Sequence, residues 1–95
     1  MELVSKYIRK NSSGRKNPIS GREIAGAFGV SGFEVRKLVN DARRNGDPIC
    51  STNKGYYISV DKTEISEQIA SMRGRIAVME GAISGLEKYL RKVSR

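Results

Sequence analysis

Residues 36–44 are rich in side chains that can bind nucleic acid. Arginine and lysine donate hydrogen bonds to guanine O6 and N7, and asparagine pairs with adenine N6 and N7. Each good bidentate contact discriminates between bases by roughly 1–3 kcal/mol. Such contacts form only if a rigid element carries the side chains into a groove of the duplex. If this stretch is helical, it predicts a DNA-reading surface that consists of Arg36, Lys37, Asn40, Arg43 and Arg44.

The segment 32–45 has the pattern of an amphipathic helix. Ser31 and Glu34 form a capping box, in which the hydroxyl and the carboxylate each accept a backbone N–H that the helix leaves unpaired. Gly46 suits the left-handed conformation that ends many helices. Apolar residues recur at helical spacing and leave the polar residues on the opposite face. These apolar residues are Val35, Leu38, Val39 and Ala42.

A shorter helix is predicted just before this one. Ser20 and Glu23 form a second capping box, so a helix should run from about Gly21 to Phe28, where Gly29 interrupts it. The apolar spacing near the N-terminus predicts a first helix of roughly ten residues, and the polar residues 11–17 indicate a loop. The side chains of the second helix expected to face inward are Ile24, Ala27 and Phe28.

Two β-prone runs follow Gly46 and predict a hairpin. Residues 49–51 and 56–59 are the expected strands, joined by residues 52–55. Asn53 and Gly55 can both adopt a positive φ, so we expect a loop of about four residues. Cys50 should be a small buried residue. Tyr56 and Tyr57 alternate between the faces of the strand, so one of them should lie in the core.

Four segments of this region match the pattern of a known domain. They are Ile19–Ala25, Phe28–Ser31, Pro48–Ser51 and Gly55–Ile58, with Val35, Val39, Arg43 and Gly46 between them. Residues 19–58 thereby resemble the winged-helix domain at the N-terminus of biotin-operon repressors and of many bacterial and phage regulators. Leu38 and Ala42 depart from the family, which commonly has a polar residue and a larger Leu there, so the packing under helix 32–45 is in doubt. The resemblance implies that this helix enters the major groove, that the hairpin 49–59 is a wing on the DNA backbone, and that the domain is not enzymatic.

Other side chains suit phosphate better than bases. Phosphate contacts fix the register on DNA and carry no sequence information. We expect them from Ser31, at the helix N-cap, and from Lys54, at the tip of the hairpin, with Lys16 and Arg22 in the same class. Phe33 could stack on a thymine methyl group, but we expect it to pack against the first helix. The alternative for these basic residues is a solvated helix face. The full predicted DNA-binding set is Lys16, Arg22, Ser31, Gly32, Arg36, Lys37, Asn40, Arg43, Arg44, Asn53 and Lys54.

The charge of the chain agrees with a polyanionic partner. Its 95 residues include 18 Lys plus Arg and 10 Asp plus Glu, which gives a net charge of +8. Residues 1–60 carry 11 basic and 5 acidic side chains, whereas residues 61–95 carry 7 and 5, so the polyanion site should belong to the first segment.

The composition also excludes several classes of protein. With no histidine and with Cys50 as the single cysteine, the sequence offers no zinc site and no disulfide framework. A glycine-rich phosphate loop is missing too, so we expect no enzyme, no metal and no cofactor. Neither a membrane-spanning stretch nor a secretion signal is evident, and we expect a cytoplasmic protein with no membrane partner.

The last third of the chain has a heptad pattern. From Ile65 onward, apolar residues recur in alternating steps of four and three without a polar interruption, which is typical of a coiled coil. Ile dominates the a positions and Met or Leu the d positions, which favours a parallel pair. Glycines at 74, 81 and 85 weaken the helix, and small residues beside the seam leave an antiparallel pair or a four-helix bundle open. Packing of this helix against the winged-helix domain of its own chain is a further alternative. The predicted oligomerisation residues are Ile65, Ile69, Met72, Ile76, Met79, Ile83, Leu86, Leu90 and Val93.

Together these features predict an α+β, mainly α protein with two parts. Residues 1–60 should form a winged helix-turn-helix head of three helices and a two-stranded wing, and residues 61–95 a long heptad-repeat helix. We expect sequence-specific binding to double-stranded DNA by a transcriptional regulator that associates with itself, as a homodimer first and a tetramer second. The partner proteins, if any, are unknown. One alternative is a DNA-packaging or replication adaptor, similar to a small terminase subunit, that builds a larger oligomer; another is an interaction or RNA-binding module.

Overall fold

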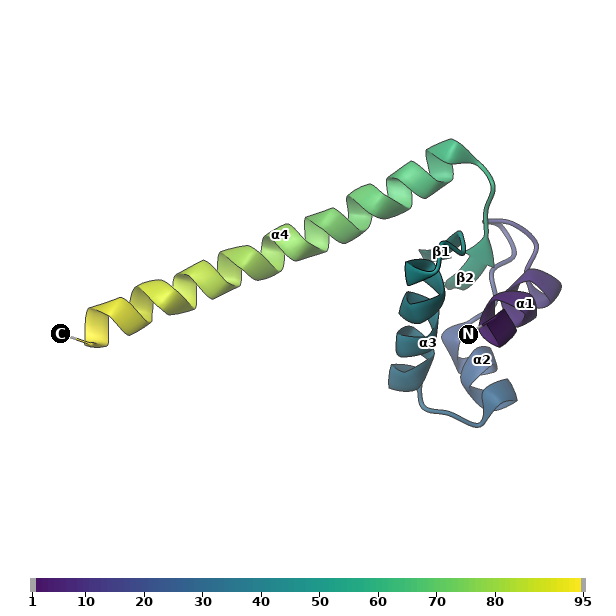
Figure 1. The fold of residues 1–95 in the computed structure, drawn as a ribbon, viewed down its shortest axis with the longest axis horizontal. Coiled ribbons are helices and arrows are strands. Elements are labelled where there is room, and N and C mark those ends of the chain that lie inside the picture. The colour runs from purple at the N-terminus through teal and green to yellow at the C-terminus, as the bar shows by residue number, and fades with distance from the viewer. Residues whose placement is uncertain (1, 95) are drawn as a thin grey trace. The chain divides into compact units, whose positions relative to one another are not determined.

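The computed structural model describes residues 2–94 and is mainly helical (Figure 1). In this part of the chain, four helices accompany one two-stranded antiparallel sheet. Among the described residues, none of the helices combines the length and the apolar character that a membrane span requires. The chain divides into two compact units, of which the first ends at Ile65 and the second begins at Ser66. The elements are α1 (Glu2–Asn11), α2 (Gly21–Phe28), α3 (Gly32–Arg44), β1 (Ile49–Thr52), β2 (Gly55–Ile58) and α4 (Lys62–Val93).

Local capping interactions set the ends of α2 and α3, and the predicted bounds of both helices are confirmed. The capping box of α3 is complete, because Ser31 Oγ accepts the Glu34 N–H at 3.1 Å and the Glu34 carboxylate accepts the Ser31 N–H at 3.0 Å. At α2 the box is only half formed. Ser20 Oγ accepts the Glu23 N–H at 3.1 Å, but the Glu23 carboxylate accepts a bond from the Ser20 hydroxyl rather than from its backbone.

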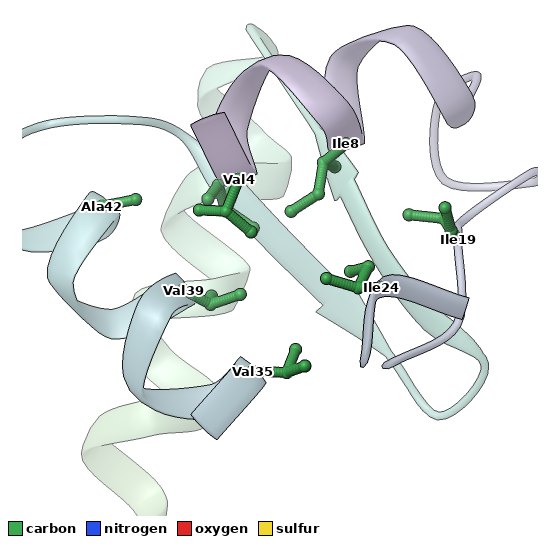
Figure 2. Close-up of a cluster of buried hydrophobic side chains, with 8 residues drawn as sticks. Val4, Ile8, Ile19, Ile24, Val35, Val39 and Ala42 are labelled. Atoms are coloured by element: carbon green, nitrogen blue, oxygen red, sulfur yellow. The ribbon is translucent and has the colours of Figure 1, made fainter. Parts of the chain in front are cut away.

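The first unit is here called the head. Its helices α1, α2 and α3 close over one apolar core (Figure 2). A fully buried aliphatic side chain stabilises a fold by about 1.5–3 kcal/mol, so this cluster is the main source of stability in the head. Its members are Val4, Ile8, Ile19, Ile24, Val35, Val39, Ala42 and Ile49.

The prediction that three residues of α2 face inward is wrong for one of them. Ala27 is exposed, and Ala25 packs against the core in its place. Ile24, Phe28 and Ala25 occupy a continuous arc of the helix, and Ala27 lies beyond the edge of that arc. Leu38, which departs from the family pattern, is half-buried and packs against the same core.

The hairpin is tighter than its sequence predicts. Thr52 pairs with Gly55, so its turn consists of two residues rather than four, and only Gly55 among the residues concerned has a positive φ, of 152°. Ile19 adds a bridge on the outer edge of β2, where it exchanges two backbone hydrogen bonds of 2.8 Å with Tyr56. A Cβ atom at Gly55 would lie 2.2 Å from the Ile19 carbonyl oxygen. Glycine is therefore required at this position by the segment that leads into α2.

The other face of the hairpin covers a small polar cluster at the start of α4. Cys50 and Tyr57 pair across the strands, and both are buried. Arg15 Nε donates to the Tyr57 hydroxyl at 3.2 Å and lies 3.9 Å from the Glu64 carboxylate, which also accepts a bond from Ser59 Oγ at 2.7 Å. Burial raises the pKa of both the Cys50 thiol and the Tyr57 hydroxyl above their ordinary values. The expectations of a buried Cys50 and of one core tyrosine are confirmed.

The helix α4 differs from every element of the head, because none of its described residues is buried. It is continuous from Lys62 to Val93 despite its three internal glycines. Of the predicted heptad positions, Ile65 and Met72 are half-buried. The others are exposed by between 48 % and 73 % of their surface: Ile69, Ile76, Met79, Ile83, Leu86, Leu90 and Val93.

Candidate nucleic-acid interface

The outward face of α3 carries the polar side chains predicted to meet DNA. Because Val35, Val39 and Ala42 are buried against the core, the opposite side of the helix must face solvent. Arg36, Lys37 and Asn40 are all exposed there, and the capping box at Ser31 gives the helix a defined start beside them. Buried residues thus hold one side of α3 rigidly, while donors and acceptors project from the other.

The two acidic residues of α3 are already engaged. Glu34 accepts the Ser31 N–H within the capping box, and Asp41 lies 3.3 Å from Arg44 in an ion pair one turn apart. These contacts reduce the negative potential that a phosphate backbone would meet along α3. Ser31 is consequently a capping residue first, since Glu34 already occupies its backbone N–H.

Arg43 has a structural role that the sequence did not reveal. It is half-buried, and its Nε donates to the Ile49 carbonyl oxygen at 2.8 Å, which links the end of α3 to β1. Its Nη1 also donates to Asn40 Oδ1 at 3.3 Å, so Arg43 orients the Asn40 carboxamide. That oxygen keeps a second lone pair and the amide nitrogen keeps its donors. Asn40 therefore retains the two groups needed to pair with adenine.

A shallow hollow joins α2, α3 and β2 on the surface of the head. Its volume is about 450 Å³, and Arg22 from α2 and Arg36 from α3 both line it, with Tyr56 from β2 as a third wall. Two of the predicted residues, from consecutive helices, thereby line one site. The remaining lining residues are Gly21, Ala25, Gly32 and Val35.

The turn of the hairpin lies next to the start of α2. The contact of Gly55 with the backbone of Ile19 and Ser20 fixes this position. Asn53 and Lys54, which immediately precede Gly55, are exposed at the tip. The hairpin tip and Arg22 at the start of α2 therefore belong to the same side of the head.

Two of the predicted residues behave differently from this group. Lys16 is exposed in the turn that the Ser13–Asn17 bridge closes, and it does not line the hollow. Phe33 does not pack against α1 as expected, because 73 % of its surface is exposed. It precedes Val35 by two residues, or about 200° around a helix, and so lies opposite the core face. Residue counting alone could have revealed this position.

Ile19 and Tyr56 make contributions that the sequence pattern did not reveal. Together they attach β2 to the segment before α2, and Tyr56 also forms part of the hollow. A single glycine before two tyrosines was the available signal, but its cause is a contact with a residue 36 positions earlier in the chain.

Comparison of the chain with family models, curated proteins and solved structures gives no significant match. The described residues contain no group of His, Cys, Asp or Glu side chains that could hold a metal ion. The surface formed by α2, α3 and the hairpin is therefore the feature whose geometry and charge bear on function.

Proposed function

We propose that the protein is a sequence-specific DNA-binding protein of the winged helix-turn-helix type that regulates transcription as an oligomer. In this proposal α3 enters the major groove, and the β1–β2 hairpin acts as a wing on the phosphate backbone. The observation that carries the proposal is the outward face of α3, where Arg36, Lys37 and Asn40 are exposed while the opposite face is buried.

Each of these side chains has a role that follows from its chemistry. Arg36 and Lys37 would donate to guanine O6 and N7, and Asn40, oriented by Arg43, would pair with adenine. The exposed ring of Phe33, at the start of α3, suits an apolar contact with a thymine methyl group. These residues would read sequence.

Residues around the hollow would bind the phosphate backbone of the DNA. Arg22 and Arg36 line the same hollow, and Asn53 and Lys54 form the exposed hairpin tip next to α2. Their donors can bind phosphate oxygens and so fix the register of α3 in the groove. Because phosphate contacts release bound counterions, this part of the interaction should weaken steeply as salt concentration rises.

Self-association through α4 would complete this function. A single head of this size makes few contacts with DNA, whereas two linked heads gain affinity because the second binds at high effective concentration. The row of apolar residues that α4 exposes supports such an association.

Selection of bound sequences from random duplex DNA tests the proposal, followed by affinity measurements with the selected duplex. The variant Arg36→Ala/Lys37→Ala/Asn40→Ala should lower that affinity at least about a hundredfold, since each lost contact discriminates by roughly 1–3 kcal/mol. Lys6→Ala/Lys10→Ala removes the same number of charges from exposed positions on α1 and should change affinity much less. Unchanged affinity in the α3 variant, with its helical content intact, would exclude α3 as the reading element.

A further inference from the structure

The nine heptad residues of α4, from Ile65 to Val93, form an apolar stripe, and a second copy of α4 is a partner that fits this stripe. Seven residues of the stripe expose about half of their surface or more. Together with Ile65 and Met72, which are half-buried, they recur in the alternating steps of four and three that let two helices interlock side chains. Because the two faces would be identical, they would match in spacing and length without any further partner.

The charges of α4 are separated along its length. Residues 61–68, from the position just before α4 into its first turns, carry three acidic and one basic side chain, a net charge of −2, of which Glu64 is ion-paired with Arg15 at 3.9 Å. Residues 87–94, at its end, carry one acidic and three basic side chains, a net charge of +2. The basic side chains at the end are Lys88, Arg91 and Lys92. The helix is thus acidic at one end and basic at the other.

This separation distinguishes the two ways in which copies of α4 can pair. In a parallel pair the two basic ends lie side by side, and so do the two acidic ends, so both ends repel. In an antiparallel pair each basic end lies against an acidic end, and the helix dipoles also oppose one another favourably. Ion pairs beside the seam do not decide the matter. A parallel pair offers Arg75 with the partner's Glu80, and an antiparallel pair offers Arg73 with the partner's Glu80.

An antiparallel register exists that satisfies the length and the stripe together. If Lys62 faces the partner's Val93, the two helices overlap along their whole length. The same register sets Ile65 against the partner's Leu90 and Ile76 against the partner's Met79, so that every a position meets a d position. No residue of the stripe between these ends is left without an apolar counterpart.

We infer that α4 pairs with the α4 of a second copy in antiparallel orientation. This inference rests on the self-association in the proposed function and adds its geometry. The head of each copy joins α4 at its start, so the two points of attachment lie at opposite ends of the pair, about 45 Å apart at 1.5 Å per residue. In a parallel pair these points would be only about 10 Å apart. The two DNA half-sites should accordingly tolerate a separation of more than one helical turn, which is about 34–36 Å.

Distances between spin labels on the full chain test the orientation. In a Cys50→Ala background, a label at Ser94→Cys should lie about 50 Å from its counterpart, because its position faces the region before Lys62 of the partner. A label at Ala77→Cys, near the centre of α4, is the matched control and should be close to its counterpart in either orientation. A short distance at both positions would overturn the antiparallel inference while leaving self-association intact. A monomeric mass at all concentrations would overturn self-association itself, and the DNA affinity of the α3 variant tests the head separately.

Charge reversal gives an independent test of the same inference. Lys88→Glu/Arg91→Glu/Lys92→Glu would set acidic ends against acidic ends in an antiparallel pair, and the dimer should dissociate at least about tenfold more readily at low salt. In a parallel pair the substitution merely exchanges one repulsion for another, so an unchanged dissociation constant would contradict the inference. For the unmodified protein, added salt should weaken an antiparallel pair, whereas stronger association with salt would again indicate parallel helices.

Discussion

The head and the part of α4 from Ser66 onward differ in what they do with their apolar residues. In the head, residues from three helices and a strand converge, and Ile8, Ile24 and Ala42 are fully enclosed. In α4 from Ser66 onward, residues of the same types recur just as regularly, yet none is buried. The head therefore encloses its own apolar residues, whereas α4 leaves its apolar residues exposed or only half-buried. The same substitution should have different consequences in the two regions.

Glycine gives the largest expected contrast. Gly55→Ala should lower the free energy of unfolding of the head by about 4 kcal/mol or more, because the new Cβ would overlap the Ile19 carbonyl group at a positive φ. Gly85→Ala is the matched change in α4. Apart from the adjacent residues and the helix's own backbone, no atom lies within 4 Å of the Cβ that it adds, so it should stabilise the helix by about 1 kcal/mol. Thermal unfolding followed by circular dichroism measures both. Equal effects would remove the distinction between the regions.

Isoleucine gives the next contrast. Ile24→Ala should cost the head about 2–5 kcal/mol, since the side chain is fully buried and its removal leaves a cavity. Ile83→Ala, about half exposed, should leave the unfolding of the head unchanged and weaken self-association instead. Denaturant unfolding and sedimentation equilibrium separate the two effects. A loss of head stability in the Ile83 variant would show that α4 serves the head.

Replacement of serine by alanine should also change the free energy of unfolding differently at a helix end and within a helix. Ser31→Ala removes the capping box of α3 and should destabilise the head by about 1 kcal/mol. Ser71→Ala, at an exposed position inside α4, should be neutral or slightly stabilising, because alanine has the higher helix propensity. Chemical denaturation of the two variants checks this. If Ser31→Ala had no effect on stability, the capping box would not stabilise α3.

The smallest expected effect is a loss of stability at alkaline pH. Burial raises the pKa of the Cys50 thiol and that of the Tyr57 hydroxyl above their ordinary values, so both stay protonated in the folded head after they ionise in the unfolded chain. The unfolded state then binds fewer protons, and stability falls as pH rises above about 9. Cys50→Ala/Tyr57→Phe should flatten this fall in a pH series of melting temperatures. Tyr89→Phe, at an exposed position on α4, should leave it as it is.

Local interactions explain why much of the head could be predicted from the sequence. Ser31 and Glu34 define the start of α3 within four residues, and Gly46 ends it with a φ of 95°, so the pattern was sufficient. The need for glycine at position 55 depends on Ile19, which only the tertiary fold brings close. The role of Arg43 likewise depends on where the Ile49 carbonyl lies. Sequence pattern cannot supply such contacts between distant segments.

The outward surface of α3 was only partly predictable for a related reason. The exposure of Arg36, Lys37 and Asn40 follows from helical periodicity, and so does that of Phe33, for which our expectation of packing was wrong. The hollow that joins Arg22 to Arg36 depends on the packing of α2 against α3 and could not be read from spacing.

The central proposal is that the head reads DNA and α4 joins the heads, and one competition measurement tests it most directly. The preference for the selected duplex over a scrambled one is compared between the α3 variant Arg36→Ala/Lys37→Ala/Asn40→Ala and the α4 variant Ile76→Asp/Ile83→Asp. The α3 variant should bind both duplexes about equally, because only non-specific phosphate contacts remain. The α4 variant should bind both more weakly yet still prefer the selected duplex. The reverse pattern, with preference lost in the α4 variant and kept in the α3 variant, would contradict the proposed division between the two regions.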